Sequence, residues 1–297
     1  MAKIDLHGIF PPITTPFING KVACDKLASN VEKWNKTGLK GFVVLGSNGE
    51  YVYLSEEEKR RVVDSVVQSA GDRMQIIAGT GCESTAETIR LTEDCARLGA
   101  HAALVVTPQY YVGEMSEAAL LKHYSEVAEH SPIPILVYNV PKFTHINLAA
   151  GIVARLSEHP NIVGIKDSSG NVIQLGEIVN RVAGDFDVLV GTAGVLFSGL
   201  TIGSAGGVCA LANVAPEACV KIYDLVKAGD LDAARDLQLR MLPVNQAVTA
   251  VYGVPGLKAA MDMRGYFGGD PRLPLLPSSE AERSEIEAIL KKADLIN

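Results

Sequence analysis

Polar residues that can react with carbonyl groups stand directly after short apolar runs in this chain of 297 residues. Lys166 follows the run 162–165, where removal from water favours the neutral amine. A neutral amine attacks a carbonyl carbon and forms a Schiff base, which then acts as an electron sink. Two structural alternatives are a lysine that extends to the rim of the fold and a lysine paired with Asp167.

Tyr138 precedes Lys166 by 28 residues, which is about one strand–helix unit. If neighbouring strands carry the two side chains, they converge, and the tyrosine hydroxyl can relay a proton. The alternative is a core aromatic side chain whose hydroxyl bonds a backbone carbonyl.

Two glycine-containing segments and a tyrosine pair complete the polar candidates. The segment 46–50, Gly-Ser-Asn-Gly-Glu, offers donors suited to a carboxylate, although an ordinary turn explains it equally. The segment 203–207 suits either a phosphate or close helix–strand packing. Tyr110 and Tyr111 either reach the same site or pack at a subunit interface.

Short apolar runs alternate with stretches of helical periodicity about eight times, which is typical of strand–helix units around a parallel sheet. Ser-x-x-Glu capping boxes at Ser55 and Ser84 mark the starts of two helices. The expected strands are 8–16, 41–47, 75–81, 102–108, 133–141, 162–168, 186–192 and 207–212, and the expected helices are 56–70, 85–98, 117–130, 148–158, 172–182 and 217–228.

Eight such units predict an α/β fold of the (β/α)8 TIM-barrel type. The barrel is expected to be complete near residue 230, which gives a catalytic domain over 1–230 and a C-terminal helical extension over 231–297 packed on it. Because active sites of such barrels lie at the C-terminal ends of the strands, the polar segments that follow the strands are expected at one end.

Composition excludes several classes of function. The net charge of −7 disfavours nucleic acid, and the apolar runs are far shorter than the roughly 20 residues that span a membrane. The five cysteines and six histidines have no CxxC, HxH or HExxH spacing, so neither a disulfide framework nor a metal site is expected. No signal core opens the chain, and we expect a cytoplasmic enzyme that works without metal or cofactor.

Together these segments resemble the dihydrodipicolinate synthase and N-acetylneuraminate lyase family of pyruvate-dependent class I aldolases. The resemblance covers nearly the whole chain and rests on GSNGE at 46–50, YNVP at 138–141 and GIKDSSG at 164–170, in the order and at the spacing of the family. It implies that Lys166 forms the Schiff base with pyruvate and that Tyr138 shuttles protons.

The resemblance also implies supporting roles. Ser47 and Asn48 would bind the pyruvate carboxylate, Ser168 would contact the rest of the substrate, and backbone near Val208 would line the pocket. Tyr110, or Tyr111 beside it, would enter the site of a neighbouring subunit, because the family usually forms homotetramers.

One difference from the family's sequence motif bears on the choice of substrate. Synthases of the family have YNVPxRT, whose arginine grips the second substrate's carboxylate, whereas Phe143 stands at that position here. Segments 81–85, 105–111, 207–214 and 253–258 are similar to 4-hydroxy-2-oxoglutarate aldolase. The expected reaction is therefore cleavage of 4-hydroxy-2-oxoglutarate to pyruvate and glyoxylate. The alternatives are a 2-keto-3-deoxy sugar acid aldolase or dehydratase, 4-hydroxy-tetrahydrodipicolinate synthase, neuraminate lyase, a phosphate-binding isomerase and a non-catalytic pyruvate-binding module.

Overall fold

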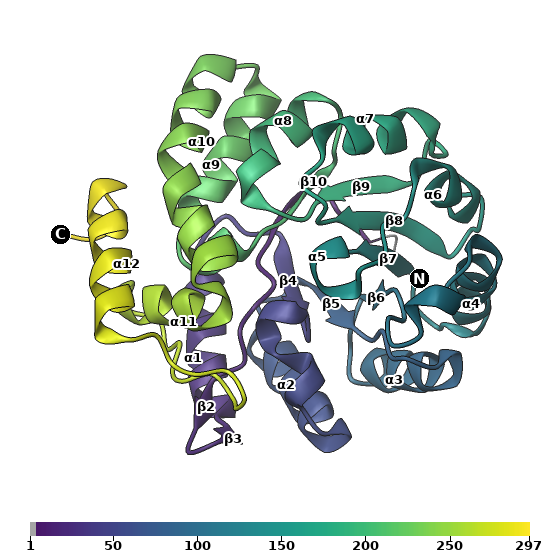
Figure 1. Ribbon diagram of the computed structural model, residues 1–297, viewed down its shortest axis with the longest axis horizontal. Coiled ribbons are helices and arrows are strands. Elements are labelled where there is room, and N and C mark those ends of the chain that lie inside the picture. Colours follow the sequence, from purple (N-terminus) through teal and green to yellow (C-terminus); the bar gives the residue numbers. More distant parts are fainter. Residues whose placement is uncertain (1–3) are drawn as a thin grey trace.

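Eight parallel strands curve around a common axis at the centre of the computed structural model, which describes residues 4–297 (Figure 1). In sheet order they are β1 (Gly8–Phe10), β10 (Gly206–Val208), β9 (Asp187–Val190), β8 (Ile162–Asp167), β7 (Ile135–Asn139), β6 (Ala102–Val106), β5 (Gln75–Gly79) and β4 (Gly41–Val44). A parallel bridge between Pro12 and Val43 joins the two outer strands of this order, and the Ile13 N–H donates to Val43 O at 2.9 Å. The predicted (β/α)8 barrel is confirmed.

Helices surround the strands on the outside of the sheet (Figure 1). They are α1 (Cys24–Trp34), α2 (Glu56–Ser69), α3 (Thr85–Arg97), α4 (Glu117–His130), α5 (Pro141–Thr144), α6 (Ala150–Leu156), α7 (Val172–Arg181), α8 (Leu196–Thr201) and α9 (Pro216–Ala228). The capping box at Ser55 is complete, because the Ser55 and Glu58 side chains each accept from the other's backbone N–H. Ser84 accepts from the Glu87 N–H, and the Glu87 carboxylate instead binds Arg90. The sequence patterns did not indicate helices α1, α5 and α8.

Apolar side chains fill both sides of the sheet. Phe10, Leu136 and Val208 belong to a cluster inside the barrel, whereas Trp34 and Ile135 belong to a larger cluster between the strands and the helices. Because each strand is buried on both faces, its sequence is continuously apolar rather than alternating.

The C-terminal extension comprises α10 (Leu231–Gln246), a π-helical turn (Ala247–Val251), α11 (Gly253–Met263) and α12 (Glu280–Lys292), on the side of the barrel that holds α1 and α9 (Figure 1). The Arg272 guanidinium donates to both carboxylate oxygens of Glu58 at 2.7 Å. The Asn30 amide exchanges two 2.8 Å hydrogen bonds with the backbone of Phe267. The extension is thus fixed to the barrel, and the division into domains at residue 230 stays a prediction.

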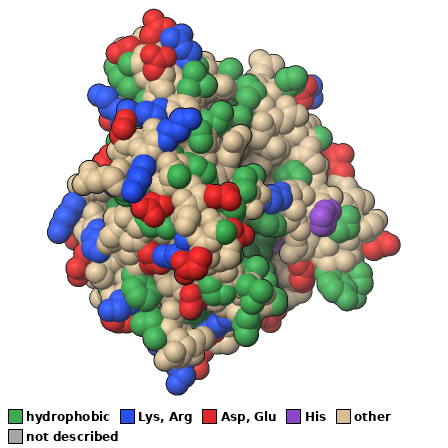
Figure 2. Space-filling model, turned by 60° about the vertical axis from the view of Figure 1, so that its left-hand side comes forward, with side chains coloured by type: hydrophobic (Ala, Val, Ile, Leu, Met, Phe, Trp, Pro, Cys, Tyr) green, Lys and Arg blue, Asp and Glu red, His purple; other side chains and the backbone are tan. Residues whose placement is uncertain are grey.

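Charged side chains of both signs are interspersed with apolar ones over the face drawn in Figure 2. A hairpin of β2 (Phe17–Ile18) and β3 (Lys21–Val22) precedes α1. None of the helices in residues 4–297 is long and apolar enough to cross a membrane.

Candidate active site

Tyr138 and Lys166 are register partners on the neighbouring strands β7 and β8. Partners on adjacent parallel strands point to the same face, and the Lys166 Nζ lies 4.1 Å from the centroid of the Tyr138 ring. Lys166 is 2% exposed, so it does not extend to the rim of the fold. The next residue, Asp167, points to the opposite face and accepts from Gln174 Nε2 at 2.7 Å and from Asn139 Nδ2 at 3.0 Å. Pairing of Lys166 with Asp167 is therefore wrong.

The environment of Tyr138 favours loss of its phenolic proton. Burial raises the pKa of Tyr138, but the charge of Lys166 and hydrogen bonds with Ser47, Lys166 and Ser168 outweigh that effect, so the pKa lies below its usual 10. A hydroxyl with a lowered pKa that contacts an amine and two other hydroxyls is suited to proton relay.

The segment 46–50 forms a short 3-10 turn, Ser47–Gly49, directly after β4. The residues in the left-handed region are Leu45 (φ 59°) and Glu50 (φ 55°), and neither glycine of the loop is among them. The turn therefore forms without a glycine in the left-handed region. The Thr15 hydroxyl donates to Gly49 O at 2.7 Å and so fixes the turn to the segment that follows β1.

A cavity of about 840 Å³ opens at the C-terminal ends of the strands. Five residues predicted for the site line this one cavity: Ser47, Asn48, Tyr138, Lys166 and Ser168.

The glycine directly after β9, Gly191, leaves room for the Ser168 side chain in this cavity. A Cβ atom at Gly191 would lie 2.0 Å from Ser168 Oγ, so a larger residue there would displace the serine. Ser168 donates its hydroxyl to Gly191 O at 3.3 Å.

Two predicted site residues lie outside the cavity lining. Tyr110 is 78% exposed and packs edge to face on Tyr111, which is 67% exposed, with ring centroids 5.0 Å apart. The backbone N–H of Tyr110 donates to Glu83 at 2.8 Å. Val208 is buried in the interior cluster that also contains Tyr138, and Ala210 lines the cavity in its place.

Comparisons with known proteins agree with this geometry. The model of the dihydrodipicolinate synthetase family matches residues 5–293. The chain belongs to this family. It is an enzyme of the pyruvate-dependent class I aldolase type, as the sequence led us to expect.

Relatives in this family match nearly the whole length of the chain. A 4-hydroxy-tetrahydrodipicolinate synthase from Methanothrix thermoacetophila is 40% identical over 96% of both chains. A chloride-inhibited dihydrodipicolinate synthase from Acinetobacter baumannii, solved with pyruvate, has a TM-score of 0.93 and 33% identity over 98% of this chain and 100% of that one. YagE, a prophage protein of E. coli K12 in the same family, also solved with pyruvate, has a TM-score of 0.91 and 28% identity over 98% and 99%. The first two are named synthases, so the expected likeness to 4-hydroxy-2-oxoglutarate aldolase stays a prediction.

Several residues that line the cavity were not predicted as site residues. Burial raises the pKa of Tyr51, and the nearby Tyr138 raises it further. The position of Tyr51 directly after the 46–50 segment was the available signal. Lys142 and the π-helical turn also line the cavity, and Pro243 in the preceding helix α10 was the only local mark of irregularity there.

The glycines of segment 203–207 are explained by packing. A Cβ at Gly206 would lie 2.1 Å from Gly8 O on β1, and one at Gly207 would lie 2.8 Å from a methyl carbon of Leu196. Neither residue lines the cavity that contains Lys166. The close strand–strand and strand–helix approach accounts for both glycines, as the packing alternative predicted.

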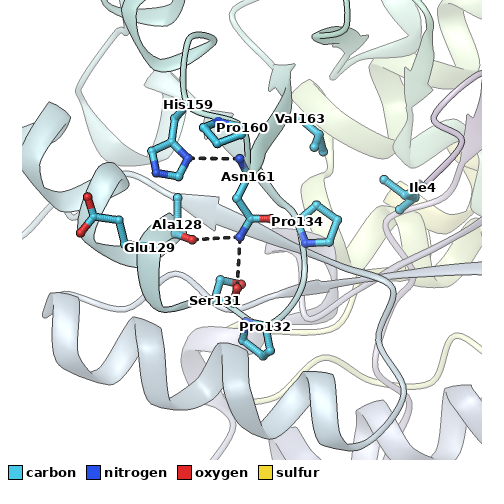
Figure 3. Close-up of a pocket in the computed structure, with 10 residues that line it drawn as sticks. All are labelled: Ile4, Ala128, Glu129, Ser131, Pro132, Pro134, His159, Pro160, Asn161 and Val163. Atoms are coloured by element: carbon cyan, nitrogen blue, oxygen red, sulfur yellow. Dashed lines mark hydrogen bonds between the residues drawn. The ribbon is translucent and has the colours of Figure 1, made fainter. Parts of the chain in front are cut away.

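A second cavity, of about 650 Å³, lies at the opposite end of β7 and β8 (Figure 3). The side chain of Asn161 donates to Ala128 O at 2.9 Å and to Ser131 O at 3.1 Å, and its backbone N–H donates to His159 Nδ1 at 3.1 Å. These bonds join the loops that precede the two strands. The Asn161 side chain is therefore committed to holding these loops together, and the residues predicted for the chemistry line the cavity at the other end.

Proposed function

We propose that Lys166 attacks the C2 carbonyl of a 2-oxo acid and forms a Schiff base with its pyruvate unit. The observation that carries the proposal is the contact of the Lys166 amine with the Tyr138 ring at 4.1 Å inside the cavity. No carboxylate in residues 4–297 lies within ion-pair distance of Lys166, so the amine has no competing partner. Two similar solved structures hold pyruvate, which supports the same ligand here.

The proposed reaction is a retro-aldol cleavage. Loss of water from the carbinolamine gives a protonated imine, and Tyr138 takes the proton of the substrate's C4 hydroxyl. The C3–C4 bond breaks, its electron pair moves into the imine to give an enamine, and an aldehyde leaves. Protonation of the enamine at C3 and hydrolysis release pyruvate and free Lys166.

Other residues would orient the substrate. Ser47 and Asn48 offer a hydroxyl and an amide beside Lys166, which suits the C1 carboxylate, and Ser168 faces the rest of the chain. The exposed Tyr110, or Tyr111 beside it, would enter the cavity of a neighbouring subunit in a homotetramer. Near Val208, the backbone at Ala210 would complete the lining of the pocket.

For the substrate we propose 4-hydroxy-2-oxoglutarate, cleaved to pyruvate and glyoxylate. Phe143 supports this choice, because its ring is 50% exposed at the mouth of the cavity, where the synthase motif has an arginine. A neutral ring supplies no bidentate bond to a carboxylate.

A second candidate is 4-hydroxy-tetrahydrodipicolinate synthase, in which the enamine of pyruvate adds to an aldehyde instead of releasing one. The names of the relatives favour it, at 40% identity in the Methanothrix protein. Both candidates form the Schiff base at Lys166. They differ in the aldehyde at the mouth of the cavity, which is released in the first reaction and consumed in the second.

One experiment tests the shared step. Reduction with borohydride in the presence of pyruvate is expected to add the mass of reduced pyruvate to the peptide that contains Lys166. Lys166→Ala is expected to lose both adduct and turnover, whereas Lys36→Ala, at an exposed lysine outside the cavity, keeps both. A wild-type protein without the adduct, or an active Lys166→Ala variant, contradicts the proposal.

A second experiment assigns the substrate. Rates are compared for 4-hydroxy-2-oxoglutarate, for a 2-keto-3-deoxy sugar acid, and for pyruvate with aspartate 4-semialdehyde. Release of glyoxylate is expected to be the fastest reaction. A faster synthase reaction establishes the second candidate, and loss of water without an aldehyde product indicates a dehydratase.

A further inference from the structure

The mouth of the active-site cavity has a positive electrostatic character. Among the residues that line it, the basic side chains are Lys166 and Lys142, and the one acidic side chain is Glu50. Glu50 is neutralised from behind the cavity by Lys258, whose Nζ lies 2.6 Å from its Oε1. Lys142 is the cation at the mouth, and a protonated imine at Lys166 would add a second positive charge, so the cavity suits an anion with more than one negative charge.

Lys142 lies in α5, which begins directly after the strand that carries Tyr138. Its Nζ donates to Thr249 O, in the π-helical turn, at 3.1 Å, and it lies 5.6 Å from the centroid of the Phe143 ring. An ammonium has three N–H donors. One is used by the carbonyl, and no carboxylate in residues 4–297 lies within ion-pair distance of the group. Two donors therefore remain for a ligand.

The second element of this arrangement is the π-helical turn, whose residues 248–251 also line the cavity. The hydrogen bond to Thr249 O holds the Lys142 side chain across the mouth instead of leaving it extended into solvent. The ammonium is thus placed at the rim of the cavity that contains Lys166 near its floor.

We infer that Lys142 binds the distal carboxylate of the substrate and so selects 2-oxo acids that carry a second acidic group. The inference rests on the proposed function, because it assumes that the pyruvate unit is held at Lys166. In a family whose synthases use an arginine one position further on, Phe143 leaves the recognition of this carboxylate to the neighbouring lysine.

The test compares two substrates that differ only at the distal end, 4-hydroxy-2-oxoglutarate and 4-hydroxy-2-oxopentanoate, in which a methyl group replaces the carboxylate. Charge-assisted hydrogen bonds correspond to a factor of roughly 10 to 100. Lys142→Gln is expected to lower the ratio of kcat/KM for the dicarboxylate to kcat/KM for the monocarboxylate by about that factor, mainly through KM. Lys142→Arg is expected to keep most of the ratio, because the charge is retained.

Lys36→Gln is the matched control, since it removes the same charge from an exposed lysine outside the cavity. A ratio that changes by less than a factor of two in Lys142→Gln, or equally in Lys36→Gln, overturns the inference. Borohydride trapping of pyruvate is measured on every variant. A wild-type protein that forms no pyruvate adduct refutes the proposed function itself, whereas normal trapping with an unchanged ratio refutes only the role of Lys142.

Discussion

Replacement of Lys258 by methionine tests how the C-terminal extension supports the candidate site. The Lys258 ammonium contacts Glu50 Oε1 at 2.6 Å, Thr15 O at 2.9 Å and Asp270 O at 3.1 Å. The two charged side chains are each 1% exposed. In the variant, the Glu50 carboxylate would keep the Arg272 backbone N–H at 2.8 Å as its hydrogen-bond donor.

The expected loss follows from the burial of that carboxylate. Removing one partner of a buried ion pair costs about 3–5 kcal/mol, because the other charge is left uncompensated away from water. For a chain of this length the melting temperature falls by roughly 2 °C per kcal/mol, so a decrease of roughly 6–10 °C is expected. The assay is thermal and urea-induced unfolding followed by circular dichroism.

Two further variants identify the cause. Lys36→Met removes an exposed lysine and is expected to change the free energy of unfolding by less than about 0.5 kcal/mol. The double variant with Glu50→Gln and Lys258→Met is expected to be more stable than Lys258→Met alone, since no buried charge remains. A loss below about 1 kcal/mol in Lys258→Met, or a double variant less stable than the single one, would refute the reasoning. Because Glu50 closes the turn that carries Ser47, the single variant is also expected to raise KM for the 2-oxo acid substrate.

Three other perturbations have definite expected results. Tyr138→Phe is expected to lower kcat by about 10²- to 10⁴-fold while borohydride still traps pyruvate, and equal losses of turnover and trapping would contradict a role in proton transfer. Gly191→Ala places a Cβ 2.0 Å from Ser168 Oγ, so a loss of about 1–3 kcal/mol in urea unfolding is expected, and an unchanged midpoint would show that the strand adjusts freely. Burial lowers the pKa of His123 from 6.5 to about 4. Between these pH values the unfolded chain binds a proton that the native state does not, so stability falls by roughly 3 kcal/mol as the pH drops from 6.5 to 4. His123→Gln, at the residue whose Nδ1 lies 2.9 Å from the Thr85 hydroxyl, is expected to flatten that slope in urea titrations at the two pH values.

The positions of the strands were predictable from the sequence because burial on both faces makes them largely apolar. Their C-terminal ends were not. The second expected strand, 41–47, stops at Val44, since Leu45 adopts φ 59° and Ser47 begins a 3-10 turn. A leucine in the left-handed region runs against backbone preference, so no propensity argument finds it. Pro141 was assigned to a strand although it begins α5, where proline at the first helical position was a usable signal.

The helical character of the C-terminal extension was predictable, but its contacts with the barrel were not. Ser279 and Glu282 form a complete capping box at the start of α12, the same sequence signal that marks the helix start at Ser55. The partner of Glu50 lies more than 200 residues away in sequence, and nothing in the spacing of Glu50 and Lys258 indicates that they meet. Contacts between distant segments depend on how the extension folds back, which local patterns do not describe.

One register explains why the candidate site assembles from two strands. The alignment that pairs Tyr138 with Lys166 inside the barrel also pairs Asn139 with Asp167 on the outer face. There the Asp167 carboxylate accepts from Asn139 at 3.0 Å and from Gln174 of α7 at 2.7 Å. A slip of β8 by one residue would turn the Lys166 amine away from the cavity and bury the Asp167 carboxylate inside the barrel without these donors. The outer polar network therefore fixes the register on which the inner pair depends, and the two faces of β7 and β8 act as one unit.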